Sequence, residues 1–327
     1  MQVFYTSPWV PPEFILAHGL EPRGIWSVAE CAQPQPTAGS CAYAQTIVGL
    51  AETRGDAAFV FTTHCDQLRR GFDTLSGTAA SQGFLFNLPA TWQTPAAERL
   101  MVAELRRLGS FLLQLGGRAP SPQELAKAIS HYDQGRQRLL AAAPELSARQ
   151  FYAAVSRFHW DGSVSWDEAL APESNSIPLA LVGGPLPHWQ SHMLEAIVAA
   201  GGRIVLNATE AGERVLGGKA APDPALATDG TLPDLVESLA RSCLDRCVDV
   251  YQRPNTRLYL WLKDRIIARR PRGILLWHFV GCDLWRAEAQ SLRDYFDLPV
   301  LLLEAVDSVA DTPRQTGRIQ AFLESLR

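Results

Sequence analysis

Ala57-Ala58-Phe59-Val60-Phe61-Thr62-Thr63 is a nearly continuous apolar run of β-prone residues. Runs of this kind are typical of strands that are buried on both faces of a parallel sheet. A second such run, Gly273-Ile274-Leu275-Leu276-Trp277-His278-Phe279, lies near the other end of the chain. Each run is followed by a short turn, a Cys-Asp pair and a helical pattern. The two stretches therefore predict a parallel sheet in each half of the protein.

Shorter runs extend both predicted sheets. Strand patterns lie at 23–28 and 83–89 in the first half and at 178–182, 203–206 and 299–303 in the second, with helical patterns between them. Residues 95–157 form three helical patterns, with Ser121 and Ser147 as helix caps. This alternation predicts an α/β fold of two flavodoxin- or Rossmann-like parallel-sheet domains with a helical segment between them. The expected divisions are residues 1–92, 93–175 and 176–327.

The composition excludes several classes of protein. The chain has 327 residues, of which 47% are apolar and 20% charged, which is enough to build the cores of two domains. The net charge of −4 argues against a nucleic-acid binder, because phosphate contacts need a basic face. The sequence has no apolar run long enough to span a membrane and no signal-peptide pattern. We therefore expect a cytoplasmic protein that does not bind a membrane.

Six cysteines are the main chemical signal. They are Cys31, Cys41, Cys65, Cys243, Cys247 and Cys282. In a cytoplasmic protein of this length, cysteines serve as metal or redox groups or as buried free thiols more often than as disulfides. None of the six forms a CxxC pair, which argues against a zinc ribbon or a thioredoxin motif.

Three of the cysteines share one setting. Cys65 and Cys282 each follow a buried strand and precede a helix, and Cys41 lies in a turn before a helix. Open α/β sheets bind ligands at the carboxyl ends of their strands, and a helix N-terminus favours the thiolate form. Iron–sulfur clusters are usually held by four thiolates, so three would leave one iron open to a substrate oxygen. The alternative for each is a buried free thiol.

The other motifs leave their alternatives open. Cys243 and Cys247 share one face of a predicted helix, where they either pack or bind metal, and we expect Cys31 to be structural. The turn Gly183-Gly184-Pro185 suits either a phosphate at a helix start or a purely steric requirement. His188 and His192 lack the glutamate of a HExxH motif. The sequence contains neither a P-loop nor a GxGxxG motif.

Several segments together carry a family resemblance. They are 12–22, Ser40-Cys41-Ala42-Tyr43, Thr62-Thr63-His64-Cys65-Asp66-Gln67-Leu68-Arg69-Arg70, Phe279-Val280-Gly281-Cys282-Asp283-Leu284-Trp285, 298–304 and 317–324. In this order they resemble the 2-hydroxyacyl-CoA dehydratase and benzoyl-CoA reductase family, and within it a subunit like the D-component of 2-hydroxyglutaryl-CoA dehydratase. The two Cys-Asp segments are the specific part of the resemblance, which extends over nearly the whole chain.

The resemblance implies a cofactor and partners. It implies a 4Fe-4S cluster held by Cys41, Cys65 and Cys282 between two flavodoxin-like domains. It also implies an ATP-dependent activator protein, with a cluster of its own, that supplies one electron. The electron passes to the thioester of an acyl-CoA, and the ketyl radical then loses a hydroxyl group or allows an aromatic ring to be reduced. We expect a dimer with a paralogous subunit or with a second copy of the chain.

Other interpretations stay open. A related double-cubane protein also uses six cysteines, but it has an extra cysteine between the positions of Cys41 and Cys65 and a paired cysteine at that of Cys282. We therefore favour the single cubane over a double-cubane reductase of small molecules. A non-catalytic electron-relay subunit and an α/β protein with incidental thiols are the remaining alternatives. The resemblance identifies no catalytic residue, and Glu13, His64 and Glu288 are candidate proton carriers by their nearness to its segments.

Overall fold

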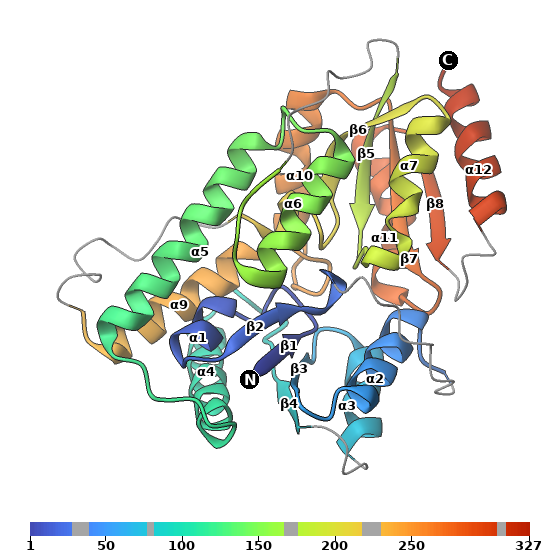
Figure 1. Ribbon diagram of the computed structural model, residues 1–327. Helices are drawn as coiled ribbons and strands as arrows, with labels where there is room; N and C mark the ends of the chain where they lie inside the picture. The colour runs from blue at the N-terminus through green and yellow to red at the C-terminus, as the bar shows by residue number, and fades with distance from the viewer. Residues whose placement is uncertain (28–38, 77–81, 167–175, 218–229, 306–311) are drawn as a thin grey trace.

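The computed structural model describes residues 1–27, 39–76, 82–166, 176–217, 230–305 and 312–327 (Figure 1). These residues contain two four-stranded sheets in which all strands are parallel, with helices packed around them. The predicted α/β fold with two parallel sheets is thus confirmed. No helix in the described ranges is both long enough and apolar enough to cross a membrane.

The first sheet has the strand order β2-β1-β3-β4. Its strands are β1 (Gln2–Tyr5), β2 (Glu21–Gly24), β3 (Ala58–Thr62) and β4 (Gln82–Phe86). The helices of this half are α1 (Pro12–Ala17), α2 (Ala42–Thr53) and α3 (Asp66–Ser76), with a short 3-10 helix η1 (Ile25–Ser27). Every residue of β3 is buried, as its continuous apolar run predicts.

The beginning of the chain differs from the prediction. The predicted strands do not include β1, although it lies inside the sheet between β2 and β3. Four residues at a chain terminus are too few to show a strand periodicity. The strand predicted at 23–28 is misplaced, because β2 ends at Gly24 and the backbone then turns into η1. Ile25 and Trp26 are apolar because they are buried in the core and not because they pair in the sheet.

The second sheet repeats this topology with the order β6-β5-β7-β8. Its strands are β5 (Ile177–Gly183), β6 (Gly202–Ala208), β7 (Gly273–Phe279) and β8 (Val300–Ala305). Its helices are α7 (His192–Ala199), α9 (Leu232–Arg246), α10 (Thr256–Arg269), α11 (Asp283–Phe296) and α12 (Thr312–Ser325), with 3-10 helices η2 (His188–Gln190) and η3 (Glu213–Val215). In both sheets the second strand lies outside the first and the third lies on its other side, which is the flavodoxin-like order.

Strand β7 is the centre of the second half. Its side chains alternate between two cores, with Leu275, Trp277 and Phe279 on one face and Ile274 and Leu276 on the other. Helices α10 and α11 cover the second face, and α7 and α12 pack together beside the sheet (Figure 1). Burial on both faces explains why β7 reads as an unbroken apolar run.

Three long helices lie between the two sheets in the sequence. They are α4 (Pro95–Gln114), α5 (Pro122–Ala142) and α6 (Ala148–Asp161). Ser121 and Ser147 cap α5 and α6 in reciprocal capping boxes, so both predicted caps are confirmed. Helix α9 packs against α4 and α5 although it follows β6 in the chain (Figure 1). The division at residues 92 and 175 remains a prediction.

A buried carboxylate joins these parts of the chain. Glu13 of α1 is fully buried and accepts hydrogen bonds from Arg136 of α5 and Arg246 of α9, each at 2.8 Å. Arg136 also pairs with Asp133. Burial opposes ionisation of Glu13, but the two guanidinium groups lower its pKa to about 2. Glu13 is therefore a structural anion and not a proton carrier at neutral pH.

Gly183 ends β5 at the first residue of the Gly-Gly turn. Its φ of +153° lies in a region that side chains disfavour, and a Cβ here would overlap the carbonyl oxygen of Trp277. Its own carbonyl oxygen accepts from Arg214, and the next amide, of Gly184, donates to the Trp277 oxygen at 3.2 Å. A Cβ at Gly184 would lie 3.3 Å from the ring of Trp285, so close packing explains both glycines of the turn.

We predict opposite effects for two Gly→Ala substitutions. Gly183→Ala should lower the free energy of unfolding by about 3 kcal/mol or more, because the methyl group meets the β7 backbone. Gly317 lies in α12, and a Cβ there has nothing within 4 Å. Gly317→Ala should therefore raise the free energy of unfolding by about 0.5–1 kcal/mol. Urea unfolding measures both. Equal effects of the two changes would contradict the steric assignment.

Candidate functional site

The three predicted cysteines lie at equivalent places in the fold. Cys41 is the residue before α2, Cys65 precedes α3 directly after the end of β3, and Cys282 is the residue before α11 after the end of β7. Strands β3 and β7 hold the same position in their sheets. The predicted placement of two Cys-Asp pairs at strand ends and helix starts is therefore confirmed.

The structure brings the three side chains together. They are close enough to affect one another's ionisation. Negative charge on Cys41 or Cys65 raises the pKa of Cys282, and negative charge on Cys41 raises the pKa of Cys65. Gly281, with a φ of +86°, forms the turn before Cys282, and a Cβ at this glycine would lie 3.9 Å from the Cβ of Cys41. Cysteines of both halves thus converge at the carboxyl ends of β3 and β7, where open α/β sheets bind ligands.

The protonation of these thiols differs from expectation. Burial raises the pKa of Cys65 to about 12, although the first-turn amides of Gln67 and Leu68 act in the opposite direction. Burial also raises the pKa of Cys282, again against a helix amide. The helix N-termini therefore favour the thiolate as predicted, but loss of solvent outweighs them. Both groups are neutral thiols at pH 7 until a cation replaces their protons.

The three thiols are candidate ligands for a metal group. Among the described residues, no three His, Cys, Asp or Glu side chains are grouped closely enough to hold one metal ion. A 4Fe-4S cluster needs a wider spacing, because each thiolate binds a different iron. Three soft sulfur donors, all partly buried, are the kind of ligands that such a group takes. Cys41, Cys65 and Cys282 are the residues that would hold it.

The remaining cysteines lie elsewhere. Cys243 and Cys247 are buried at the end of α9, where Cys243 accepts from Arg246 at 3.5 Å and Cys247 donates to the carbonyl oxygen of Pro8 at 3.4 Å. The first contact lies within α9, and the second joins the end of α9 to the N-terminal half. Cys31, predicted to be structural, lies outside the described residues.

Two titratable side chains lie beside the thiols. His64 precedes Cys65, shares a 2.6 Å hydrogen bond with the Thr62 hydroxyl, and has its Nε2 4.0 Å from Oε1 of Glu210. Burial lowers the pKa of His64 to about 4, so its ring is neutral at pH 7. Burial also raises the pKa of Glu210 to about 8, although the nearby Arg214 guanidinium acts against this. Glu210 therefore holds a proton at neutral pH.

Arg214 fixes the loop that carries Glu210. It is almost fully buried, pairs with Asp249 at 2.5 Å, and donates to the carbonyl oxygens of Ala208, Val248 and Gly183. Its guanidinium also lies 5.0 Å from the ring centre of Trp285, in the first turns of α11. One side chain thus ties the loop after β6 to the end of β5 and to the helix that begins after Cys282.

Sequence reasoning missed Glu210 and Arg214. Glu210 follows β6 by two residues, so the rule that identified the cysteines, a reactive side chain after a strand, also applies to it. Arg214 gives no such signal, because Asp249 is 35 residues away. Of the predicted proton carriers, His64 lies at the site. Glu288 binds Tyr259 and Asn255 of the neighbouring segment, and these contacts hold α10 against α11.

Aromatic side chains close the two halves around the thiols. Tyr43, two residues after Cys41, donates to the carbonyl oxygen of Thr6 at 3.2 Å. Its ring stacks on Phe279 of β7 at 5.8 Å and on Trp189 at 6.3 Å. A second contact joins the halves where the Tyr251 hydroxyl donates to Leu88 at 2.6 Å.

This geometry defines a class of protein: a two-sheet α/β protein whose cysteines converge at the strand ends. The family model for 2-hydroxyglutaryl-CoA dehydratase, D-component, matches residues 9–326, and the chain belongs to this family. Membership supports a subunit of the 2-hydroxyacyl-CoA dehydratase type, an enzyme component in a family known in general for iron–sulfur clusters. No curated protein matches the chain.

We predict a pH-dependent effect of Glu210→Gln. The carboxyl pKa is about 8 in the fold and 4.5 for an ordinary glutamate, so the protonated form stabilises the fold below pH 4.5 and this contribution is lost as the pH rises to about 8. The glutamine side chain of the variant does not ionise, so its contribution to stability does not fall as the pH rises. The stability gain of the variant should therefore grow between pH 5 and pH 8, to roughly 2–4 kcal/mol.

Urea unfolding at the two pH values measures the gain. The control is Glu195→Gln, a change at an exposed residue of α7 that should have little effect at either pH. A gain from Glu210→Gln that is the same at pH 5 and pH 8 would show that this carboxyl is ionised throughout.

Proposed function

We propose that this chain is the iron–sulfur subunit of a radical 2-hydroxyacyl-CoA dehydratase, with a 4Fe-4S cluster on Cys41, Cys65 and Cys282. The convergence of these three cysteines from two sheets is the observation that carries the proposal. The cluster would supply one-electron chemistry at an iron without a protein thiolate. The electron would come from an ATP-dependent activator protein, in agreement with the lack of a P-loop in this sequence.

The chain's own residues have defined tasks in this proposal. Glu210 holds a proton on its carboxyl group and can give it to a departing hydroxyl group, because its pKa is about 8. Neutral His64 lies beside it, and Arg214 keeps the loop in place. The stacking of Tyr43 on Trp189 and Phe279 would keep the segment that begins with Cys41 in place against the second half.

The first test is the iron content of anaerobically purified protein. The chain should hold about four irons and four sulfides. Cys41→Ser, Cys65→Ser and Cys282→Ser should each lose the brown chromophore. Cys243→Ser and Cys31→Ser should keep it, as matched changes of cysteines that the proposal does not use. Loss of the cluster in Cys31→Ser together with its retention in Cys41→Ser would overturn the assignment.

The second test concerns the substrate. Adding a 2-hydroxyacyl-CoA to the reduced protein should change the EPR spectrum of its cluster. Glu210→Gln should keep the iron and the spectral change but lose most of the dehydration rate, about a hundredfold. A response to aromatic acyl-CoA thioesters alone would indicate a benzoyl-CoA-type reductase. An unchanged spectrum with the whole panel and an intact cluster would indicate an electron-relay subunit.

The third test concerns assembly. Val280 is 52% exposed directly beside Gly281 and Cys282, so an apolar side chain faces outward at the rim of the site. We propose that the chain dimerises with a paralogous subunit or with itself, burying roughly 800 Å² or more per partner. Sedimentation should give a dimer at micromolar concentration. A monomer with no co-purifying paralogue would contradict this.

A further inference from the structure

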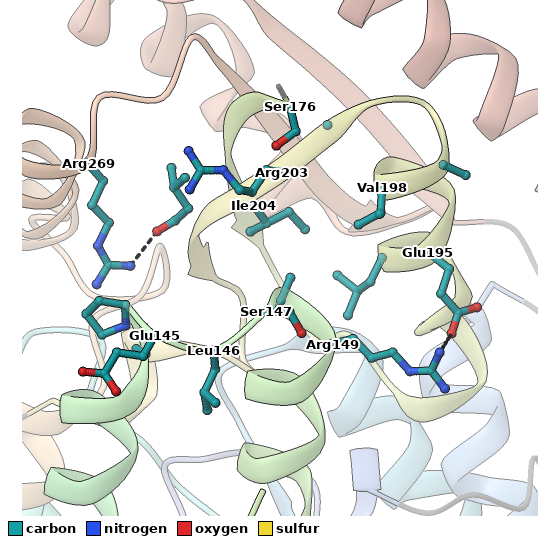
Figure 2. A pocket seen from close by; sticks show the side chains of 17 residues that line it. Glu145, Leu146, Ser147, Arg149, Ser176, Glu195, Val198, Arg203, Ile204 and Arg269 are labelled. Atoms are coloured by element: carbon teal, nitrogen blue, oxygen red, sulfur yellow. Dashed lines mark hydrogen bonds and ion pairs between the residues drawn. The ribbon is translucent and has the colours of Figure 1, made fainter. Parts of the chain in front are cut away.

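A pocket of about 620 Å³ lies away from the cysteines (Figure 2). It is bounded by the turn between α5 and α6, by α7 and by the first residues of β6. Ser176, directly before β5, and Gly202, the first residue of β6, are among its lining residues. The pocket therefore lies at the amino ends of these strands. The thiols lie at the carboxyl ends, about 20 Å away along a seven-residue strand.

The walls of the pocket are mostly aliphatic. They are formed by Leu146, Leu194, Val198, Ile204 and Val205. The volume is in the range of small-molecule sites, which combine apolar walls with a few polar groups. Because the walls come from the helical segment and from the second half, a bound molecule would contact both.

The charged groups at the rim are not equivalent. Arg149 pairs with Glu195 at 2.9 Å, and Arg269 donates to the carbonyl oxygen of Val205 (Figure 2). Arg269 also pairs with Glu213, which does not line the pocket. Arg203 of β6 is exposed, extends to the side of the strand opposite Ile204 (Figure 2), and has no carboxylate partner within the described part of the chain. Among the described lining residues, the pocket thus offers an uncompensated guanidinium group at its edge, across β6 from Ile204. An anionic group would pair with it while an apolar body fills the space.

We propose that this pocket binds an amphipathic organic anion, a carboxylate with an aliphatic body, at a second site separate from the cysteines. The carboxylate pairs with Arg203, and the aliphatic body packs between α7 and the α5–α6 turn. Binding joins the helical segment to the second sheet, so it also raises the melting temperature of the chain.

Calorimetric titration of the full chain with decanoate tests the proposal. Saturable binding at one site is expected, together with a melting temperature that rises with decanoate concentration. Arg203→Glu reverses the charge and Val198→Trp fills the pocket from a side chain that is 41% exposed on α7. Each should weaken binding by about tenfold or more. Decyltrimethylammonium, a cation with the same chain, should bind at least about tenfold more weakly than decanoate.

Leu260→Trp is the matched control. It adds the same indole to a residue of α10 that is 59% exposed and does not line the pocket, so decanoate affinity should stay within about twofold. The proposal is overturned if decanoate does not bind saturably, if Val198→Trp binds it as the unmodified chain does, or if the cation binds equally well. None of these measurements depends on the cluster, so the outcome is independent of the proposed dehydratase activity.

Discussion

The carboxylate of Glu13 constrains the arrangement of the whole chain. A buried anion is costly unless its charge is balanced, and here the balance comes from Arg136 of the helical segment and Arg246 of α9. If the parts moved apart, Glu13 and Arg246 would lose the ion pairs that balance their charges, and Arg136 would keep only Asp133 of its own helix. The first half, the helices and α9 therefore have one arrangement of low energy. In that arrangement the strand ends of the two halves face each other and the cysteines converge.

The central strands could be predicted because their environment is simple. A strand such as β3 or β7 is buried on both faces, so its own sequence is continuously apolar and shows its place in the fold. β1 is equally central, but its pairing with β2 and β3 depends on residues that are distant in the sequence. The same local signal located the cysteines, which directly follow such strands or precede helices.

The polar part of the site could be predicted only in part. His64 is adjacent to a cysteine, whereas the Arg214–Asp249 pair forms only when two loops pack together. For Glu13, by contrast, the sequence suggested a proton carrier where the structure has an ion-paired anion. Its position in a family-like segment suggested chemistry, but the two arginines that determine its charge are 123 and 233 residues away. The protonation state of a buried side chain depends on distant neighbours of this kind and on burial. A local sequence pattern contains neither.

The separation of the cysteines along the chain has a consequence for biosynthesis. Cys41 and Cys65 lie 24 residues apart, whereas Cys282 follows Cys65 by 217 residues. Because a chain leaves the ribosome from its N-terminus, no nascent chain that ends before residue 282 can present all three thiols. A group that binds all three thiols can therefore be held only after synthesis has passed Cys282. Such a group would meet a chain whose first sheet and helical segment have already been synthesised.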